Sequence, residues 1–195
     1  MSKNIATLDV DSIIFTAFHP NKQLDEYGNP MRTEDNKKFL YIDKTEDEIR
    51  ESCDSLMHMI LRRSKATHYI GFVKGKGTTT QRLLVNPDYK GNRPKESPKY
   101  WNFCKDYLIK NWGVIEANGY EVDDYVNVTR LTLPGAYIVA IDGDLLGLET
   151  KDKHHFNWRS GDWIEVSRNT ANLKFWSDMI CGQKGDNILG LVGKG

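Results

Sequence analysis

The chain has 195 residues, of which 28% are charged, and this length allows one α/β domain with a sizeable core or one domain with a small appendage. The formal net charge is zero, so no overall positive field draws the protein to nucleic acid, and any such contact requires local segregation of charge. No apolar run approaches the roughly 18 residues of a membrane span and no signal peptide is recognisable, so we expect a cytoplasmic protein with no membrane partner.

The first third of the chain predicts a strand, two helices and one polar segment. Residues 4–10 are predicted as a short buried strand, and residues 12–18 as the start of a helix. Residues 19–44 are polar and rich in turn formers, which fits a hairpin and a flexible loop equally well. Thr45 and Glu48 have the spacing of a capping box, so a helix follows them. One face of that helix is apolar and should meet the core: Ile49, Cys53, Leu56, Met57 and Ile60.

A loop with two lysines follows the second buried strand, which is predicted at residues 68–73. Residues 74–80 are rich in glycine and threonine and include Lys74 and Lys76. The segment matches no P-loop pattern. A flexible connection and a phosphate-facing loop are both open interpretations of it.

Basic and aromatic residues are mixed between residues 89 and 105. Aromatic side chains among cations suit single-stranded nucleic acid, because bases stack on the rings and phosphates pair with lysine and arginine. The same region predicts an amphipathic helix over residues 97–111 that packs Trp101, Phe103 or Tyr107 into the core. Both interpretations can hold, on opposite faces of the helix.

Alternating strands and helices in the rest of the chain predict an α/β fold with a mostly parallel sheet. A brief strand over residues 114–117 precedes a helix over residues 121–131, and residues 136–141 form the clearest buried strand. Residues 154–158 and 163–166 are predicted as two short antiparallel strands. The last predicted helix, over residues 170–181, is expected to bury Leu173, Phe175 or Trp176, and Ile180.

Two sets of chemically versatile side chains are expected to be structural. His154 and His155 are adjacent, and neighbours on a strand point to opposite faces, so the pair does not suit one metal site. Cys53, Cys104 and Cys181 are far apart in the sequence and form no Cys-x-x-Cys pair. We expect all three to be reduced, buried thiols.

Acidic residues recur where apolar runs end. In a parallel sheet the carboxyl ends of the strands open into a shared ligand cleft. Like charges in one cleft repel unless cations neutralise them, so the pattern predicts a divalent-metal site and phosphodiester hydrolysis. For the acids that open the helix at residue 121, the alternative is that they complement the helix dipole. The predicted metal ligands are Asp9, Glu121, Asp123, Asp124, Asp142, Asp144 and Asp186.

Five segments in register give the chain a resemblance to a known family. Leu8-Asp9 with the helix that follows, the Tyr-Lys-x-x-Arg pattern within residues 87–93, Glu121-Val122-Asp123-Asp124, Asp142-Gly143-Asp144-Leu145 and the hairpin at residues 185–195 occur in the family's order. Together they resemble the 5′ nucleases related to flap endonucleases, which include the 5′-nuclease domain of bacterial DNA polymerase I and phage 5′–3′ exonucleases. The resemblance covers nearly the whole chain and implies a PIN-like fold. It also implies two parts: a catalytic domain over residues 1–181, and the start of a helix–three-turn–helix motif over residues 182–195.

The sequence departs from the family pattern at two ligand positions and in length. Lys74 stands where the family has an aspartate after its second core strand, and Gln183 replaces another aspartate. One ligand is therefore missing from each of the two metal sites that the family assembles. Lys74 can instead supply positive charge or bind a phosphate, and Asp11 can partly compensate for the lost carboxylate. The family continues beyond this hairpin into further DNA-binding helices, so we expect either that the chain is truncated or that part of the duplex-binding surface is lost.

The resemblance implies two-metal hydrolysis with magnesium or manganese (Mg²⁺ or Mn²⁺). One ion, held by Asp9 and by Glu121, Asp123 or Asp124, would position and deprotonate water. The other, near Asp142, Asp144 and Asp186, would stabilise the leaving oxygen. Lys90 and Arg93 would bind the scissile phosphate and its developing charge. The expected catalytic residues are Asp9, Lys90, Arg93 and Asp142.

The implied substrate is DNA with a 5′ single-stranded flap or end, or an RNA–DNA hybrid, cut to 5′-phosphorylated products. Residues 95–105 would form a helical gateway for the single strand, and the hairpin at residues 188–195 would hold duplex phosphates with a potassium ion (K⁺). A monomer in the cytoplasm of a bacterial or phage-infected cell is expected. The expected nucleic-acid contacts are Lys74, Lys76, Tyr89, Lys90, Arg93, Lys95, Lys99, Gly190, Gly193 and Lys194.

Two other functions compete with an active nuclease. A degenerate relative would bind branched or single-stranded nucleic acid and cleave it poorly or not at all. Lys74 and Gln183 favour this alternative, whereas the retained carboxylates oppose it. A ribonuclease of the same broad fold is the third interpretation, and it gives no reason for the terminal hairpin.

Overall fold

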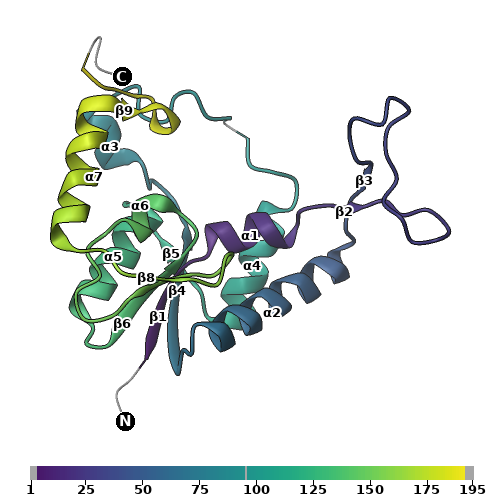
Figure 1. The fold of residues 1–195 in the computed structure, drawn as a ribbon, viewed down its shortest axis with the longest axis horizontal. Helices are drawn as coiled ribbons and strands as arrows, with labels where there is room; N and C mark the ends of the chain where they lie inside the picture. Colours follow the sequence, from purple (N-terminus) through teal and green to yellow (C-terminus); the bar gives the residue numbers. More distant parts are fainter. Residues whose placement is uncertain (1–3, 95, 192–195) are drawn as a thin grey trace.

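A six-stranded sheet forms the centre of the molecule (Figure 1). The computed structural model describes residues 4–94 and 96–191, and the strand order in this part of the chain is β5-β4-β1-β6-β7-β8. Neighbouring strands are parallel except for β7 and β8, which pair antiparallel. The strands are β1 (Ile5–Asp9), β4 (His68–Lys74), β5 (Ile115–Ala117), β6 (Ala136–Ala140), β7 (His155–Asn157) and β8 (Trp163–Ile164). This arrangement confirms the predicted α/β fold with a mostly parallel sheet.

The innermost strands bring their carboxyl ends to one edge of the sheet. β1 pairs with β4 on one side and with β6 on the other, so that Leu8 lies opposite Gly71 and Val139. Helices cover both faces, so these strands are apolar on both sides. Asp9 ends β1, and Lys74 ends β4 at the same edge. The first predicted acid and the first departure from the family pattern therefore face one region.

Two helical layers enclose the sheet. On one face, α1 (Asp11–Ala17), α2 (Glu46–Arg63) and α4 (Trp101–Trp112) pack against one another and contribute to the larger core cluster. On the other face, α5 (Val122–Thr132) contacts β1, β4 and β6 and builds a second core cluster. None of the described helices is long and apolar enough to cross a membrane.

The start and the buried face of α2 follow from its sequence. The Thr45 side chain accepts a hydrogen bond from the Glu48 N–H, and the Glu48 carboxylate accepts one from the Thr45 N–H, so the predicted capping box forms. The fully buried residues of this helix are Ile49, Cys53, Met57 and Ile60, and Leu56 is partly buried.

Two short helices near the cleft were not predicted. They are α3 (Thr80–Val85), in the lysine-containing loop region, and α6 (Gly143–Leu146), directly after Asp142. α4 begins at Trp101, later than predicted, and a turn with a hydrogen bond from the Trp101 N–H to the Pro98 carbonyl precedes it. Trp101 is buried in the core as predicted.

The helix α7 (Arg168–Cys181) forms, but the prediction of its burial was wrong. None of its residues is buried, and its contacts are mainly with β9 (Gly182–Gln183), which follows it. Its apolar residues follow a helical period, yet no described segment covers them. The exposed fractions are 69% for Leu173, 56% for Phe175, 60% for Trp176 and 43% for Ile180.

The histidines and cysteines are structural or surface residues. His155 is fully buried on β7, whereas His154 is half exposed and lies 3.4 Å from Glu165, so the two side chains lie in different environments. All three cysteines are free. Cys53 and Cys104 are buried, but Cys181 is exposed, because it ends the uncovered helix α7.

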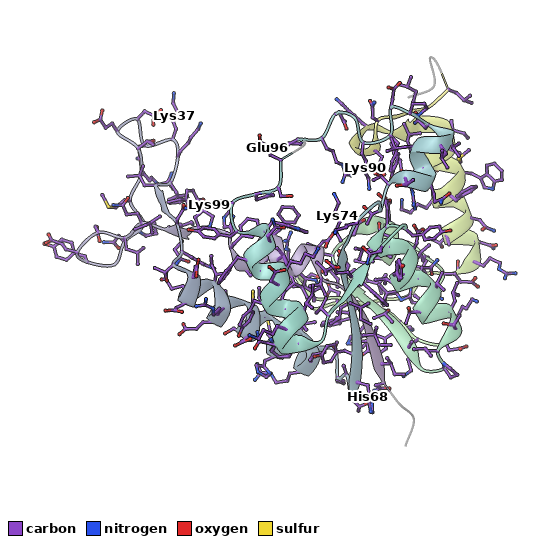
Figure 2. All side chains as sticks on the ribbon, turned by 180° about the vertical axis from the view of Figure 1, so that it is seen from behind. Lys37, His68, Lys74, Lys90, Glu96 and Lys99 are labelled. Carbon is purple, nitrogen blue, oxygen red and sulfur yellow. The ribbon has the colours of Figure 1, made fainter. Side chains whose placement is uncertain are left out.

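Residues 19–44 form an arm that projects from the body between α1 and α2 (Figure 1). Its base is the antiparallel pair β2 (Asn21–Lys22) and β3 (Tyr41–Ile42), so the hairpin interpretation holds there. Isolated bridges further out join Leu24 to Pro30 and Arg32 to Phe39. The arm carries Lys37 far from the sheet (Figure 2).

The chain after α7 folds back on it through a short antiparallel pair. β9 pairs with β10 (Ile188–Leu189), and the Leu191 N–H bonds to the Ile180 carbonyl. A Cβ on Gly190 would lie 2.3 Å from the carbonyl carbon of Cys181, so glycine permits this close packing.

The predicted division at residues 181 and 182 coincides with the end of α7 and stays a prediction. Lys95, Gly193 and Lys194 lie outside the described residues.

Candidate active site

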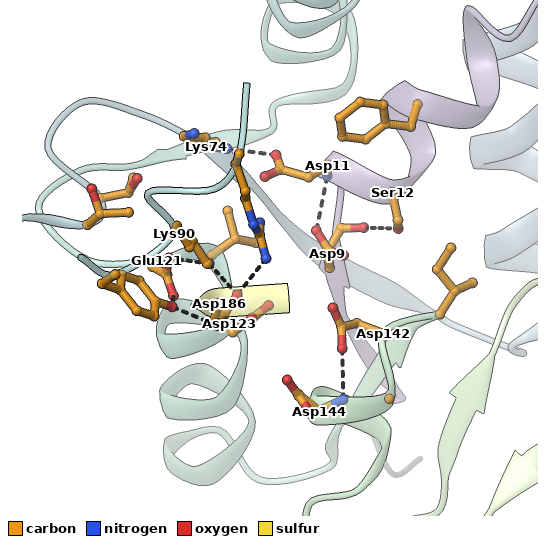
Figure 3. Close-up of a pocket in the computed structure, with 18 of the residues that line it drawn as sticks. Asp9, Asp11, Ser12, Lys74, Lys90, Glu121, Asp123, Asp142, Asp144 and Asp186 are labelled. Carbon is orange, nitrogen blue, oxygen red and sulfur yellow. Dashed lines mark hydrogen bonds and ion pairs between the residues drawn. The ribbon is translucent and has the colours of Figure 1, made fainter. Parts of the chain in front are cut away.

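A cleft of about 790 Å³ opens at the carboxyl ends of β1, β4 and β6 (Figure 3). Six of the seven predicted ligands line it, together with Lys74, Lys90 and Arg93. Asp124 lines an adjacent cavity of about 700 Å³ instead. The acids that line the first cleft are Asp9, Asp11, Glu121, Asp123, Asp142, Asp144 and Asp186.

The same local turn ends two neighbouring strands and aims their acids into the cleft. After β1, the Asp9 carboxylate accepts a hydrogen bond of 3.0 Å from the Asp11 N–H. After β6, the Asp142 carboxylate accepts one of 2.7 Å from the Asp144 N–H and caps α6. Both acids of each pair line the cleft, and the chain turns into a helix at both places.

Four of the acids have no ion-pair partner within the described residues: Asp9, Asp11, Asp123 and Asp142. Burial raises the pKa of Asp9 well above its usual range, and the charges of Asp11, Asp123 and Asp142 raise it further. Burial, with Asp142 and Glu121, raises the pKa of Asp123 to about 7. Burial raises the pKa of Asp11 to about 6, although hydrogen bonding from the Lys74 N–H opposes this. A cation among these oxygens would relieve the repulsion.

The Tyr-Lys-x-x-Arg segment neutralises two other acids. Lys90 Nζ lies 2.5 Å from Glu121 Oε1, and Arg93 Nη2 lies 2.5 Å from Asp186 Oδ1. The Tyr89 hydroxyl contacts Glu121 at 2.9 Å and Asp186 at 3.0 Å. Tyr89 is 7% exposed, and burial together with these carboxylates raises its hydroxyl pKa. The segment thus ties the start of α5 to the turn before β10.

Arg82 on α3 is a site residue that the sequence did not indicate. Its guanidinium donates to both oxygens of Asp124, at 2.8 and 3.0 Å, and lies 3.3 Å from Glu121. Asp124 also accepts the Glu121 N–H at the start of α5. Arg82 lowers the pKa of Asp124 through these hydrogen bonds. For Asp124 the helix-terminus interpretation therefore describes the structure better than a place in the cleft.

Lys174 on α7 is a second unpredicted residue. Its Nζ lies 2.8 Å from Asp144 Oδ1 and 2.6 Å from Asp178 Oδ2. Gln183, the residue that replaces a family aspartate, donates to the same Asp178 oxygen at 3.4 Å. No sequence signal linked Lys174 with Asp144, because the contact joins residues thirty positions apart.

The predicted nucleic-acid contacts are dispersed. Lys74 and Lys76 are both exposed, and Lys74 lines the cleft whereas Lys76 does not. Lys99 is exposed 3.3 Å from Asp43, near the base of the arm. Figure 2 shows Lys90, Glu96 and Lys99 spaced along a segment that runs from the α3 side to α4. Its described residues before Trp101 form turns and bends, so the helical part of the expected gateway is α4 itself.

In the described part of the chain, no three Asp, Glu, His or Cys side chains are arranged to hold one ion as they stand. Glu121, Asp144 and Asp186 are engaged by cations, and Asp9 and Asp142 accept backbone N–H groups. The donor set is nonetheless all carboxylate oxygen, which suits Mg²⁺ or Mn²⁺. Asp9, Asp123 and Asp142 fit such an ion best, because they are buried or crowded by like charge and form no ion pair with the described residues.

The fold is the PIN-like 5′-nuclease fold, as comparison with solved structures shows. No protein-family model matches the sequence, and no curated protein matches it. The bacteriophage T5 flap endonuclease, in a complex with DNA and metal ions, has a TM-score of 0.68 and 19% identity over 99% of this chain and 71% of that one. T5 5′-exonuclease with bound zinc also has a TM-score of 0.68, at 18% identity over 99% and 72% of the two chains. The Rad2 catalytic core with DNA substrate has a TM-score of 0.51 and 12% identity, over 100% and 58%.

Proposed function

We propose that this protein is a metal-dependent 5′–3′ exonuclease or flap endonuclease that hydrolyses DNA near 5′ ends or junctions. The observation that carries the proposal is the group of four acids that form no ion pair with any described residue, which shares a cleft with Lys90 and Arg93 on a 5′-nuclease fold. Like charges crowded into one cleft are costly for folding, so their presence favours a role in binding a cation.

The proposed ligands are the acids named from the sequence, with one revision. Asp9, Glu121 and Asp123 would hold one Mg²⁺ or Mn²⁺, and Asp142, Asp144 and Asp186 would hold the other, while Asp124 caps α5 and binds Arg82. When bound, such ions supply an activated water and neutralise charge on the leaving oxygen. The K⁺ expected at the hairpin stays part of this proposal.

Lys90 and Arg93 would bind the scissile phosphate. Both already line the cleft, and both hold acids that are proposed ligands. On substrate binding they would exchange the carboxylates of Glu121 and Asp186 for phosphate oxygens. This exchange would free those carboxylates and place two positive charges on the reacting group.

The substrate class is DNA with a 5′ single-stranded flap or end, or an RNA–DNA hybrid, bound by a monomer. Lys74 in the cleft and the exposed Lys76 would contact its backbone, and the Lys99 region would follow the strand towards α4. Phosphate contacts of this kind fix the orientation of the strand without reading its sequence.

The test is cleavage of a 5′-labelled flap DNA in Mg²⁺ or Mn²⁺ by the wild type, by Asp142→Asn and by Asp106→Asn. Asparagine can still cap α6, so Asp142→Asn removes the charge and keeps the fold. Asp106 is an exposed acid on α4 and serves as the matched control. We expect metal-dependent cutting that Asp142→Asn reduces by about a hundredfold or more and Asp106→Asn leaves unchanged.

A binding protein that does not cut is the second candidate. Lys74 lies at the end of β4 in the cleft, and Gln183 binds Asp178. Cations also engage Asp124 on α5 and Asp144 on α6. DNA binding without cleavage in any divalent ion would support this candidate and overturn the nuclease proposal.

A further inference from the structure

Lys174 crosses from α7 to α6 and meets an acid that the proposed function assigns to a metal ion. Its ammonium group lies between Asp144 and Asp178, at 2.8 and 2.6 Å. Asp178 is one turn further along α7, which is the ordinary spacing of a helical ion pair. Asp144 belongs to a different helix, so an ordinary surface pair on α7 does not explain its contact.

The backbone at the end of α6 leaves room for the Lys174 stem. A Cβ on Gly147 would lie 2.6 Å from Lys174 Cδ, 2.9 Å from its Cε and 2.9 Å from the Gly143 carbonyl oxygen. Gly147 has a φ of −81°, which any residue adopts, so the backbone angle does not require glycine. The missing side chain is therefore what lets the lysine lie against α6 and reach Asp144.

Gln183 adds a neutral side chain to the same group of contacts. Gln183 is neutral and donates to the Asp178 oxygen that Lys174 also contacts. On the side of Asp144, the cleft therefore has the cation Lys174 and the neutral amide of Gln183 close by. The side of Asp9, Asp123 and Asp142 has neither, because no ion pair reaches those acids in the described chain.

We propose that Lys174 is a built-in counter-cation for Asp144, so that the protein binds one divalent ion strongly beside Asp9 and Asp123, and a second one beside Asp142 and Asp144 only when Lys174 is displaced. The inference rests on the proposed function for the identity of the ion. An ammonium group within hydrogen-bonding distance of a carboxylate both neutralises it and repels an incoming divalent cation.

The test is a titration of the protein with Mn²⁺ alone. Electron paramagnetic resonance measures the free ion, and calorimetry measures the binding. The wild type should bind one ion strongly and a second one weakly. Lys174→Met keeps the aliphatic stem and should strengthen the second site by about tenfold or more while the first is unchanged. Lys110→Met, which removes an exposed lysine on α4, should leave both sites unchanged.

Gly147→Ala tests the same contact without removing the charge. The added methyl group should push the stem of Lys174 away from α6 and strengthen the second site in the same direction as Lys174→Met. Unchanged or weaker binding of the second ion in both variants would overturn this inference and leave the nuclease proposal intact. Absence of the strong first ion from the wild type would overturn the metal-dependent nuclease itself.

Discussion

His155 is a buried titratable residue outside the cleft, and it makes stability depend on pH. Burial, together with the charge of the nearby Arg130, lowers its pKa from 6.5 to about 4. The unfolded chain therefore binds a proton between pH 6.5 and pH 4 that the folded chain does not. Stability from this residue is complete above the unfolded pKa and falls as the pH drops through that window.

We expect His155→Leu to remove this component of acid sensitivity, which amounts to at most about 3 kcal/mol. The acids of the cleft with raised pKa act in the opposite sense, so the difference in slope between variant and wild type isolates the histidine. The measurement is urea unfolding from pH 4 to pH 7 without metal, with the exposed His68→Gln as control. Equal slopes for wild type and His155→Leu would contradict the assignment.

The residues of the cleft divide into those that the sequence could indicate and those that it could not. Asp9, Asp142 and Lys90 could be located because they follow a strand or lie in a short pattern, and the fold then brings strand ends together. Arg82 and Lys174 could not be located, because each acts through a partner at least thirty positions away. Such pairs depend on how helices are placed, which local patterns do not encode.

At the scale of elements, the capping box of α2 is a local device with a measurable effect. Thr45→Ala leaves the Glu48 N–H without its side-chain partner and should lower the free energy of unfolding by about 1 kcal/mol. Thr45→Ser keeps the hydroxyl and should change it little. Urea unfolding measures both variants, and equal losses in the two would show that the hydroxyl is not responsible.

The elements that were predicted correctly are those whose signal is local. The buried strands β1 and β6 and the helix α2 have a strong apolar period or a cap. The helices α3 and α6 have six and four residues and depend on contacts such as Arg82 with Asp124 and the Asp142 cap, so the chain pattern alone does not reveal them. In α7 the local signal is misleading. Its apolar residues have a helical period and predict a buried face, but the fold leaves that face exposed.

At the scale of the whole molecule, the arm and the body are separable. Residues 21–42 include no buried residue, and their ends are paired across Asn21 and Ile42. Replacing them with a short glycine–serine turn should therefore change the free energy of unfolding by less than about 1 kcal/mol, since the gap to be closed is small. Urea unfolding and Mn²⁺ titration of the shortened protein measure this, and loss of the cooperative transition would contradict it.

The position of β1 in the sheet affects the order in which the chain can fold during synthesis. Ile5 pairs with His68 and with Ala136, which lie 63 and 131 residues later (68 − 5 and 136 − 5). Because β1 is made before β4 and β6, it has no final neighbour until β4 is made, and it is not enclosed until β6 is made. Non-local pairing of this kind slows folding and keeps apolar strands exposed for longer. The nascent chain therefore depends most on chaperones while the apolar strand β1 has not yet paired with β4 and β6.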